Sequence, residues 1–120
     1  MSEHNKLGKA GEEAAANFLI EEGFRIRERN WQFSHLEIDI IAEINDFIIF
    51  IEVKSRSGTY FEQPFQAVTK KKQKFIIKAA NAYIEKYEID LEARFDIISI
   101  VSSNGHIEID HIQDAFYPTI

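Results

Sequence analysis

The spacing of apolar residues along the chain, helical in some segments and alternating in others, predicts its helices and strands. Residues 5–22 are rich in alanine and predict a helix, with Asn5 as its cap and Gly23 at its end. A second helix is expected from Pro64 to about Tyr87, because proline is favoured in the first helical turn. Short apolar or alternating runs between turn residues predict strands at residues 24–32, 36–43, 47–55, 94–101 and 106–111.

This order of helix, three strands, helix and two strands predicts an α/β sandwich in which helices flank a mixed sheet. The strands at 36–43 and 47–55 are almost continuously apolar, which is typical of strands that are buried on both faces. A chain of 120 residues has the length of one domain. We therefore expect a single domain over residues 1–120, with its motif-bearing core at about 6–101.

Charged residues interrupt these two apolar strands at four positions. If residues 45–46 form a two-residue hairpin turn, opposed residues have numbers that sum to 91, so that Asp39 faces Glu52 and Glu37 faces Lys54. Because side chains alternate between faces, all four charged groups are expected on one side of the sheet. The apolar residues expected on the other side are Ile38, Ile40, Ile51 and Val53.

Two ionised carboxylates in opposed positions repel, since their Cβ atoms lie about 4.5–5.5 Å apart. A shared proton, a nearby cation such as Lys54, or a divalent metal ion would offset this repulsion. Mg²⁺ takes hard oxygen ligands and needs only one or two carboxylates because it keeps several waters. The pattern therefore indicates a metal-assisted hydrolase. A cross-strand ion pair of Glu37 and Lys54, with Asp39 and Glu52 separated by a register shift, is the structural alternative.

Charge is distributed unevenly along the chain. The net charge of −6 argues against a nucleic-acid partner, but the segment from Lys54 to Lys78 holds seven basic residues against one acidic residue, Glu62. A solvated helix face explains this segment as well as phosphate binding does. Lys72 falls on the expected packing face of the second helix, from which it could reach over the sheet. The candidate nucleic-acid-binding residues are Arg56, Lys71, Lys72, Lys74 and Lys78.

The sequence has no apolar run of the ~18–20 residues that a membrane span needs, and no signal peptide at its start. It contains no cysteine, as is common in a reducing compartment. We therefore expect a cytoplasmic protein without a membrane partner. The sequence does not decide whether the chain forms a homodimer.

Other polar and aromatic residues suggest structural roles. The histidines lack metal-ligand spacing and are expected at the surface; they are His4, His35, His106 and His111. Asp96 lies inside a strand and is interpreted as a hydrogen-bonded structural residue. Trp31 is expected to pack in the core or at a strand edge, although Trp31 or Tyr60 could stack on an unpaired base.

Several motifs together resemble a known family. Glu37-Ile38-Asp39 followed by Glu52-Val53-Lys54 resembles the PD-(D/E)xK signature of restriction-endonuclease-like nucleases. The segments GKAGEEAAANFL, LEIDIIA, IFIEVKSRSG, QAVTKKKQ and RFDIISI are similar to the YraN family of bacterial proteins, which is related to the Holliday-junction resolvases. The resemblance extends from about Lys6 to Val101 and implies a restriction-endonuclease-like fold.

The resemblance also implies roles for individual residues. Asp39 and Glu52 match metal ligands of the related nucleases, with the Val53 backbone carbonyl as a common third ligand and Mg²⁺ or Mn²⁺ as the ion. Lys54 matches the catalytic lysine, and Glu12 matches the glutamate that completes the site in the resolvase branch.

The leading hypothesis is thus a metal-dependent endonuclease that acts on DNA, with branched DNA among its substrates. The alternative is a nucleic-acid-binding module with the nuclease fold and little or no turnover. A third reading, a protein-interaction domain, rests only on the apolar tail AFYPTI.

Overall fold

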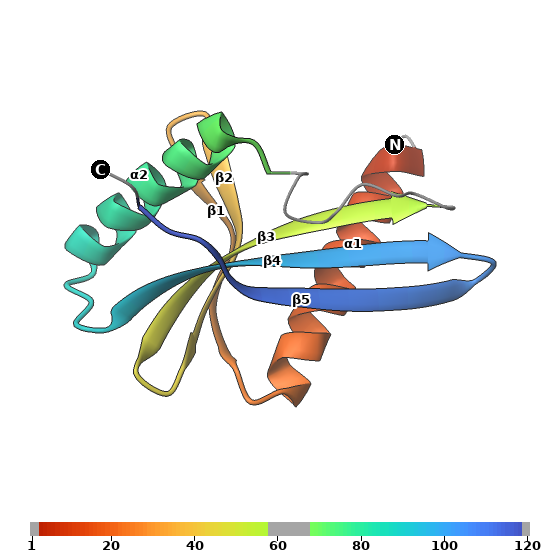
Figure 1. Ribbon diagram of the computed structural model, residues 1–120, viewed down its shortest axis with the longest axis horizontal. Helices are drawn as coiled ribbons and strands as arrows, with labels where there is room; N and C mark the ends of the chain where they lie inside the picture. Colours follow the sequence, from red (N-terminus) through yellow and green to blue (C-terminus); the bar gives the residue numbers. More distant parts are fainter. Residues whose placement is uncertain (1–2, 58–67, 119–120) are drawn as a thin grey trace.

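The helices and strands follow one another in the order that the sequence predicts (Figure 1). The computed structural model describes residues 3–57 and 68–118. The elements within these ranges are α1 (Glu3–Glu21), β1 (Arg25–Phe33), β2 (Leu36–Ile44), β3 (Phe47–Ser57), α2 (Lys70–Lys86), β4 (Glu92–Ser103) and β5 (His106–Phe116). Neither helix in this part of the chain combines the length and the apolar character that crossing a membrane requires.

Both helices begin at positions other than those predicted. α1 begins at Glu3, so that Asn5 lies inside the helix and is not its cap. Its end is as predicted: Gly23 takes a φ of 96°, and the Phe24 N–H closes the last turn on the Leu19 carbonyl at 2.9 Å. The predicted helix start at Pro64 lies outside the described residues.

α2 begins at Lys70, because Thr69 is extended and its hydroxyl accepts the Lys72 N–H at 3.1 Å. Val68 and Thr69 are not helical, so the predicted continuous helix from residue 64 is wrong. β5 was also predicted too short: it reaches Phe116, whose ring stacks on Phe95 at a centroid distance of 5.3 Å.

The strands form one mixed sheet in the order β1-β2-β3-β4-β5. β3 and β4 pair in parallel, while the other neighbouring strands pair antiparallel. The parallel pair needs a crossover, and α2 lies in the segment that connects these two strands.

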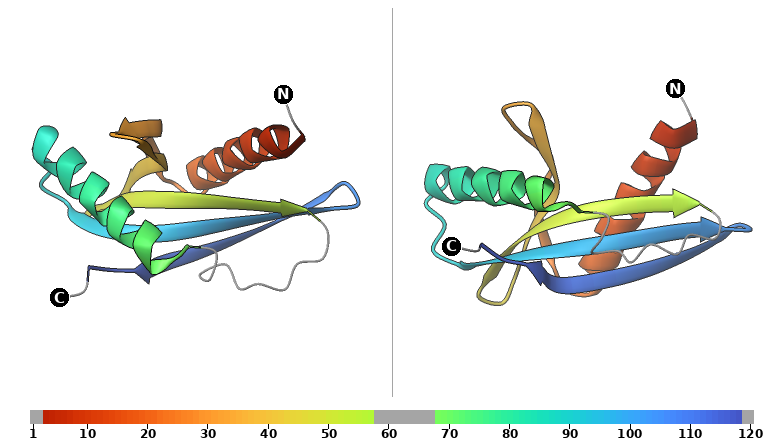
Figure 2. Two further views of the ribbon diagram at one scale, coloured as in Figure 1. Left: turned by 90° about the horizontal axis from the view of Figure 1, so that it is seen from above. Right: turned by 45° about the horizontal axis from the view of Figure 1, so that its top comes forward.

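Each face of the sheet has its own hydrophobic core. Ile48 and Phe50 of β3 point to the cluster under α2, whereas Ile49, Ile51 and Val53 point to the cluster under α1. The two helices lie toward opposite ends of the long strands (Figure 2). The predicted burial of the central strands on both faces is confirmed.

Gly11 allows α1 to approach β3 closely. A Cβ atom at this position would clash with the hydroxyl of Ser55 and lie 3.0 Å from the Ser55 Cβ. Glu12 is the next residue, so this close approach brings its backbone near the sheet.

Candidate metal and nucleic-acid site

The candidate site lies where β2 and β3 part. Their pairing runs from Ile44 and Phe47 to Ile40 and Ile51, so every recorded pair has the predicted sum of 91. Beyond this point β2 stays paired with β1, and β3 stays paired with β4. A side chain replaces the ladder at the fork: Oδ2 of Asp39 accepts the Val53 N–H at 2.8 Å. The register prediction is thus confirmed as far as the fork.

The predicted arrangement beyond the fork is wrong in two respects. Ile38 packs in the cluster under α2, while Ile40 packs under α1, so the expected alternation of faces does not hold there. Glu37 is exposed and lies opposite Gln32 of β1, so it does not face Lys54. Both differences follow from β2 leaving β3 at Asp39 and following β1 instead.

Asp39 and Glu52 form a closely coupled carboxylate pair. Glu52 is 7% exposed and Asp39 is half-buried. Burial, the negative charge of Glu52 and a hydrogen bond shared with Glu52 together raise the pKa of Asp39 to about 8, against the opposing effects of the Val53 N–H and Lys72. Such a hydrogen bond needs a proton on one of the two carboxyl groups. In the absence of a metal ion, the pair therefore holds a proton near neutral pH.

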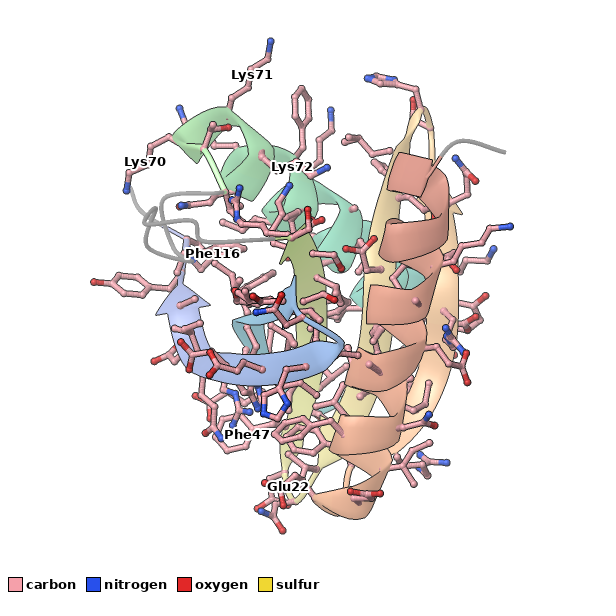
Figure 3. All side chains as sticks on the ribbon, turned by 90° about the vertical axis from the view of Figure 1, so that its right-hand side faces the viewer. Glu22, Phe47, Lys70, Lys71, Lys72 and Phe116 are labelled. Carbon is pink, nitrogen blue, oxygen red and sulfur yellow. The ribbon has the colours of Figure 1, made fainter. Side chains whose placement is uncertain are left out.

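The cation beside this pair comes from α2 and is Lys72. Its Nζ lies 4.0 Å from Oε2 of Glu52. Figure 3 shows Lys72 directed toward the end of β3, whereas Lys71 points away from the sheet. Lys54 is half-buried and makes no ion pair with a residue of the described ranges. The helical periodicity that placed Lys72 on the packing face was the signal for this contact.

Glu12 reaches the same region from α1 and is held there by Asn30 of β1. The Asn30 Nδ2 donates to Oε1 of Glu12 at 2.8 Å. Burial and the negative charges of Asp39 and Glu37 raise the pKa of Glu12, while the Asn30 hydrogen bond and Arg29 act against this rise. The site therefore gathers acidic groups from α1, β2 and β3.

Asn30 is a site residue that the sequence reasoning missed. It has a φ of 54° inside a strand, a left-handed conformation that asparagine tolerates better than most residues. Strained backbone of this kind is concentrated at functional sites. In the sequence, the indication of this role is an asparagine within a strand that is otherwise rich in arginine.

The donor set can be compared with what a divalent ion needs. Within residues 3–57 and 68–118, no group of three or more His, Cys, Asp or Glu side chains is arranged to hold a metal ion. Mg²⁺ requires fewer, because one or two carboxylates and several waters satisfy it. Asp39 and Glu52 supply two adjacent hard donors whose mutual repulsion a cation would relieve, so the pair fits such an ion. Glu12 is linked to it through electrostatic interaction with Asp39.

The basic residues of α2 divide as predicted. Lys71, Lys74 and Lys78 are exposed, whereas Lys72 is half-buried against the sheet. Arg56 is half-buried near the end of β3. The exposed lysines thus lie on the helix that also carries the cation of the carboxylate pair.

Asp96 is structural, as predicted. It is fully buried and accepts hydrogen bonds from Arg94 at 2.8 and 2.9 Å and from the Asp114 N–H at 2.9 Å, and it pairs with His111 at 2.7 Å. Burial raises the pKa of Asp96, but the hydrogen bonds outweigh burial and hold it below its ordinary value. The predicted surface position of His111 is wrong: its side chain is 8% exposed and contacts the ring of Phe18.

The remaining aromatic candidates belong mainly to the core. Trp31 packs against Tyr83 at a centroid distance of 5.1 Å, so the packing interpretation is confirmed. Tyr60 lies outside the described residues. In the apolar tail, Phe116 is buried in the sheet's core while Tyr117 is exposed, and residues 119–120 lie outside the described residues.

Comparison with known proteins places the whole chain in one family. The family model described as "Uncharacterised protein family UPF0102" matches residues 11–100. A UPF0102 protein of Bacteroides thetaiotaomicron and one of Phocaeicola vulgatus are each 49% identical over 120 residues, which covers 100% of this chain and 99% of each relative. A UPF0102 protein of Flavobacterium psychrophilum is 43% identical over 117 residues, with 98% of each chain covered. The chain therefore belongs to family UPF0102, the YraN family that its motifs resemble.

Proposed function

We propose that this protein is a metal-dependent nuclease of the PD-(D/E)xK superfamily that hydrolyses phosphodiesters in DNA. The observation that carries the proposal is the pair of half-buried Asp39 and buried Glu52 at the fork of β2 and β3, with Lys72 at 4.0 Å from Glu52. Burying two carboxylates side by side is costly for folding, and a site that binds a cation explains why they are kept together.

Each part of the site has a task in this proposal. Asp39 and Glu52 hold Mg²⁺ or Mn²⁺, and the Val53 carbonyl and Glu12 complete its surroundings. The ion supplies Lewis-acid polarisation of the phosphate and lowers the pKa of a bound water. Lys54 orients the attacking water and stabilises the charge that develops on the phosphate.

The fold is consistent with the proposed superfamily. A helix, a three-stranded unit, a second helix and a further strand follow one another, and the carboxylates lie at the point where the sheet splits. Asp39 and Glu52 occupy the positions that the PD-(D/E)xK signature gives to metal ligands.

One observation favours a second candidate, a nucleic-acid-binding module with little or no turnover. The described residues contain no ready-made group of three metal-binding side chains, and Lys72 already neutralises part of the carboxylate charge. In this alternative the proton and Lys72 satisfy the pair permanently, and the exposed lysines of α2 bind phosphates.

A cleavage assay separates the two candidates. The protein is incubated with single-stranded, duplex, flap and four-way-junction DNA in Mg²⁺, Mn²⁺ or EDTA, beside Glu52→Gln and Lys54→Ala variants. The nuclease proposal expects cleavage that needs the metal and is lost in both variants, while Lys54→Ala binds DNA within a few-fold of wild type. Binding without metal-dependent cleavage in the wild type would refute the nuclease and support the module.

The exposed lysines are tested separately from the carboxylates. Replacing Lys71, Lys74 and Lys78 together by glutamine should weaken DNA binding and flatten its salt dependence, because fewer counterions are released. An unchanged salt slope would remove α2 from the binding surface in both candidates. Failure of the wild type to bind or cut any of the four DNA forms or RNA at low salt would exclude both.

A further inference from the structure

Lys72 and Lys54 occupy different positions relative to the carboxylate pair. Lys72 lies at 4.0 Å from the Glu52 carboxylate, and its side chain is 35% exposed while that of Glu52 is 8% exposed. Lys54, the lysine of the sequence signature, has no ion pair with the described residues. The cation that neutralises the pair in this state therefore comes from α2.

The position of Lys72 on its helix is unfavourable without an anionic partner. Lys70, Lys71 and Lys72 begin α2, and its first turn contains no acidic residue. The partial positive charge of a helix N-terminus repels cations there. The Thr69 hydroxyl accepts the Lys72 N–H at 3.1 Å and so fixes the backbone from which the side chain extends. Glu52 supplies the negative charge that offsets this repulsion for Lys72.

We propose that Lys72 exchanges partners: it pairs with Glu52 in the metal-free protein and is released to bind a substrate phosphate when a divalent cation occupies Asp39 and Glu52. The inference rests on the proposed metal-dependent function. A divalent cation on the carboxylates repels the ammonium group, and the flexible side chain of lysine lets this group turn from Glu52 to a nearby phosphate. Lys72 would then be a phosphate ligand located beside the reacting group, distinct from the exposed lysines farther out on α2.

The first test is made without metal and without activity. In EDTA, Lys72→Gln should lower the thermal midpoint by about 3–5 °C relative to the Lys71→Gln variant. Lys71→Gln is the matched control, since it removes the same charge from the same helical turn at an exposed position. In a Glu52→Gln background the difference between the two variants should shrink to less than half, because the nearest carboxylate is gone and Lys72 keeps only its weaker interaction with Asp39.

The second test measures metal affinity by calorimetry with Mn²⁺ alone. Lys72→Gln should bind Mn²⁺ about tenfold more tightly than wild type and Lys71→Gln, which corresponds to about 1.4 kcal/mol. The sign holds even where the pair carries a proton. The ammonium group of Lys72 repels a divalent ion twice as strongly as it repels a proton. Removing this group therefore favours metal binding over protonation of the pair. A lysine that merely supports the fold would give weaker metal binding when replaced.

The third test follows the released ammonium group through the salt dependence of DNA binding. Ca²⁺ serves as the probe ion because it takes the same hard oxygen ligands, and the DNA is checked to be intact afterwards. With Ca²⁺, Lys72→Gln should reduce the salt slope by about one unit; in EDTA it should leave the slope unchanged.

These measurements distinguish failure of the inference from failure of the proposed function. If the wild-type protein binds no metal, the metal-dependent function is refuted, and the proposed exchange of partners is refuted with it. Wild-type protein that binds metal, combined with a Lys72→Gln variant of equal or weaker metal affinity, leaves the function in place and overturns the exchange. An equal effect of Lys72→Gln on the salt slope with and without Ca²⁺ overturns it as well.

Discussion

Replacing Asp39 by asparagine mimics the protonated form of this carboxyl group. The amide oxygen can still accept the Val53 N–H, and the amide nitrogen can donate to Glu52 as the protonated acid does. The variant therefore keeps the hydrogen bonds of the fork and loses only the ability to ionise. Comparing it with the wild type isolates the free energy of holding a proton at Asp39.

The folded-state pKa of Asp39, about 8, lies above its ordinary value of 3.8, so between these limits the folded protein binds a proton that the unfolded chain has released. The resulting stability is fully present below pH 4 and is lost as the pH rises toward 8. The slope is about 1.4 kcal/mol per pH unit, so the wild type should lose about 2–3 kcal/mol relative to Asp39→Asn between pH 5 and 7.

Urea unfolding in EDTA at pH 5, 6, 7 and 8 measures this difference directly. Asp90→Asn serves as the control, because it removes one exposed carboxylate from the same protein. Addition of Mg²⁺ at pH 8 should restore stability to the wild type and not to Asp39→Asn, since only the wild type offers both carboxylates. A free-energy difference between wild type and Asp39→Asn that stays constant with pH would refute the shared proton.

Three further changes test the surroundings of the site. Gly11→Ala should lower the free energy of unfolding by about 1–3 kcal/mol through overpacking, and by less in a Ser55→Ala background, as urea unfolding of the wild type, the two single variants and the double variant would show. Asn30→Gly keeps the left-handed backbone accessible but removes the hydrogen bond to Glu12, so the Glu12 pKa followed by NMR should rise further; an unchanged pKa would contradict the positioning role. Asp96→Asn should destabilise by about 3–5 kcal/mol because it leaves the mostly buried guanidinium of Arg94 without its anion, and a loss below 1 kcal/mol in urea unfolding would argue against the cluster.

Sequence patterns were sufficient for the elements and for the central register. The alternation of apolar residues placed the five strands, and the residues at 45–46 gave the sum of 91 that β2 and β3 follow as far as Ile40 and Ile51. These features are local: a two-residue turn fixes the register, and a strand that is buried on both faces must be apolar throughout. The pairing of Asp39 with Glu52 followed from them.

Other features depended on contacts between segments distant in the chain. Sequence periodicity put Lys72 on the packing face of α2, but only the packing of α2 on the sheet showed that it faces Glu52 while Lys54 has no described ionic partner. The fork at Asp39, the Asn30 contact to Glu12 and the buried Asp96 and His111 pair likewise join separate elements. A hairpin pattern assumes that two strands stay together, whereas β2 follows β1 beyond the fork and carries Ile38 into the core under α2. Such choices depend on which neighbouring surfaces bury the most apolar area, a property of the assembled tertiary structure.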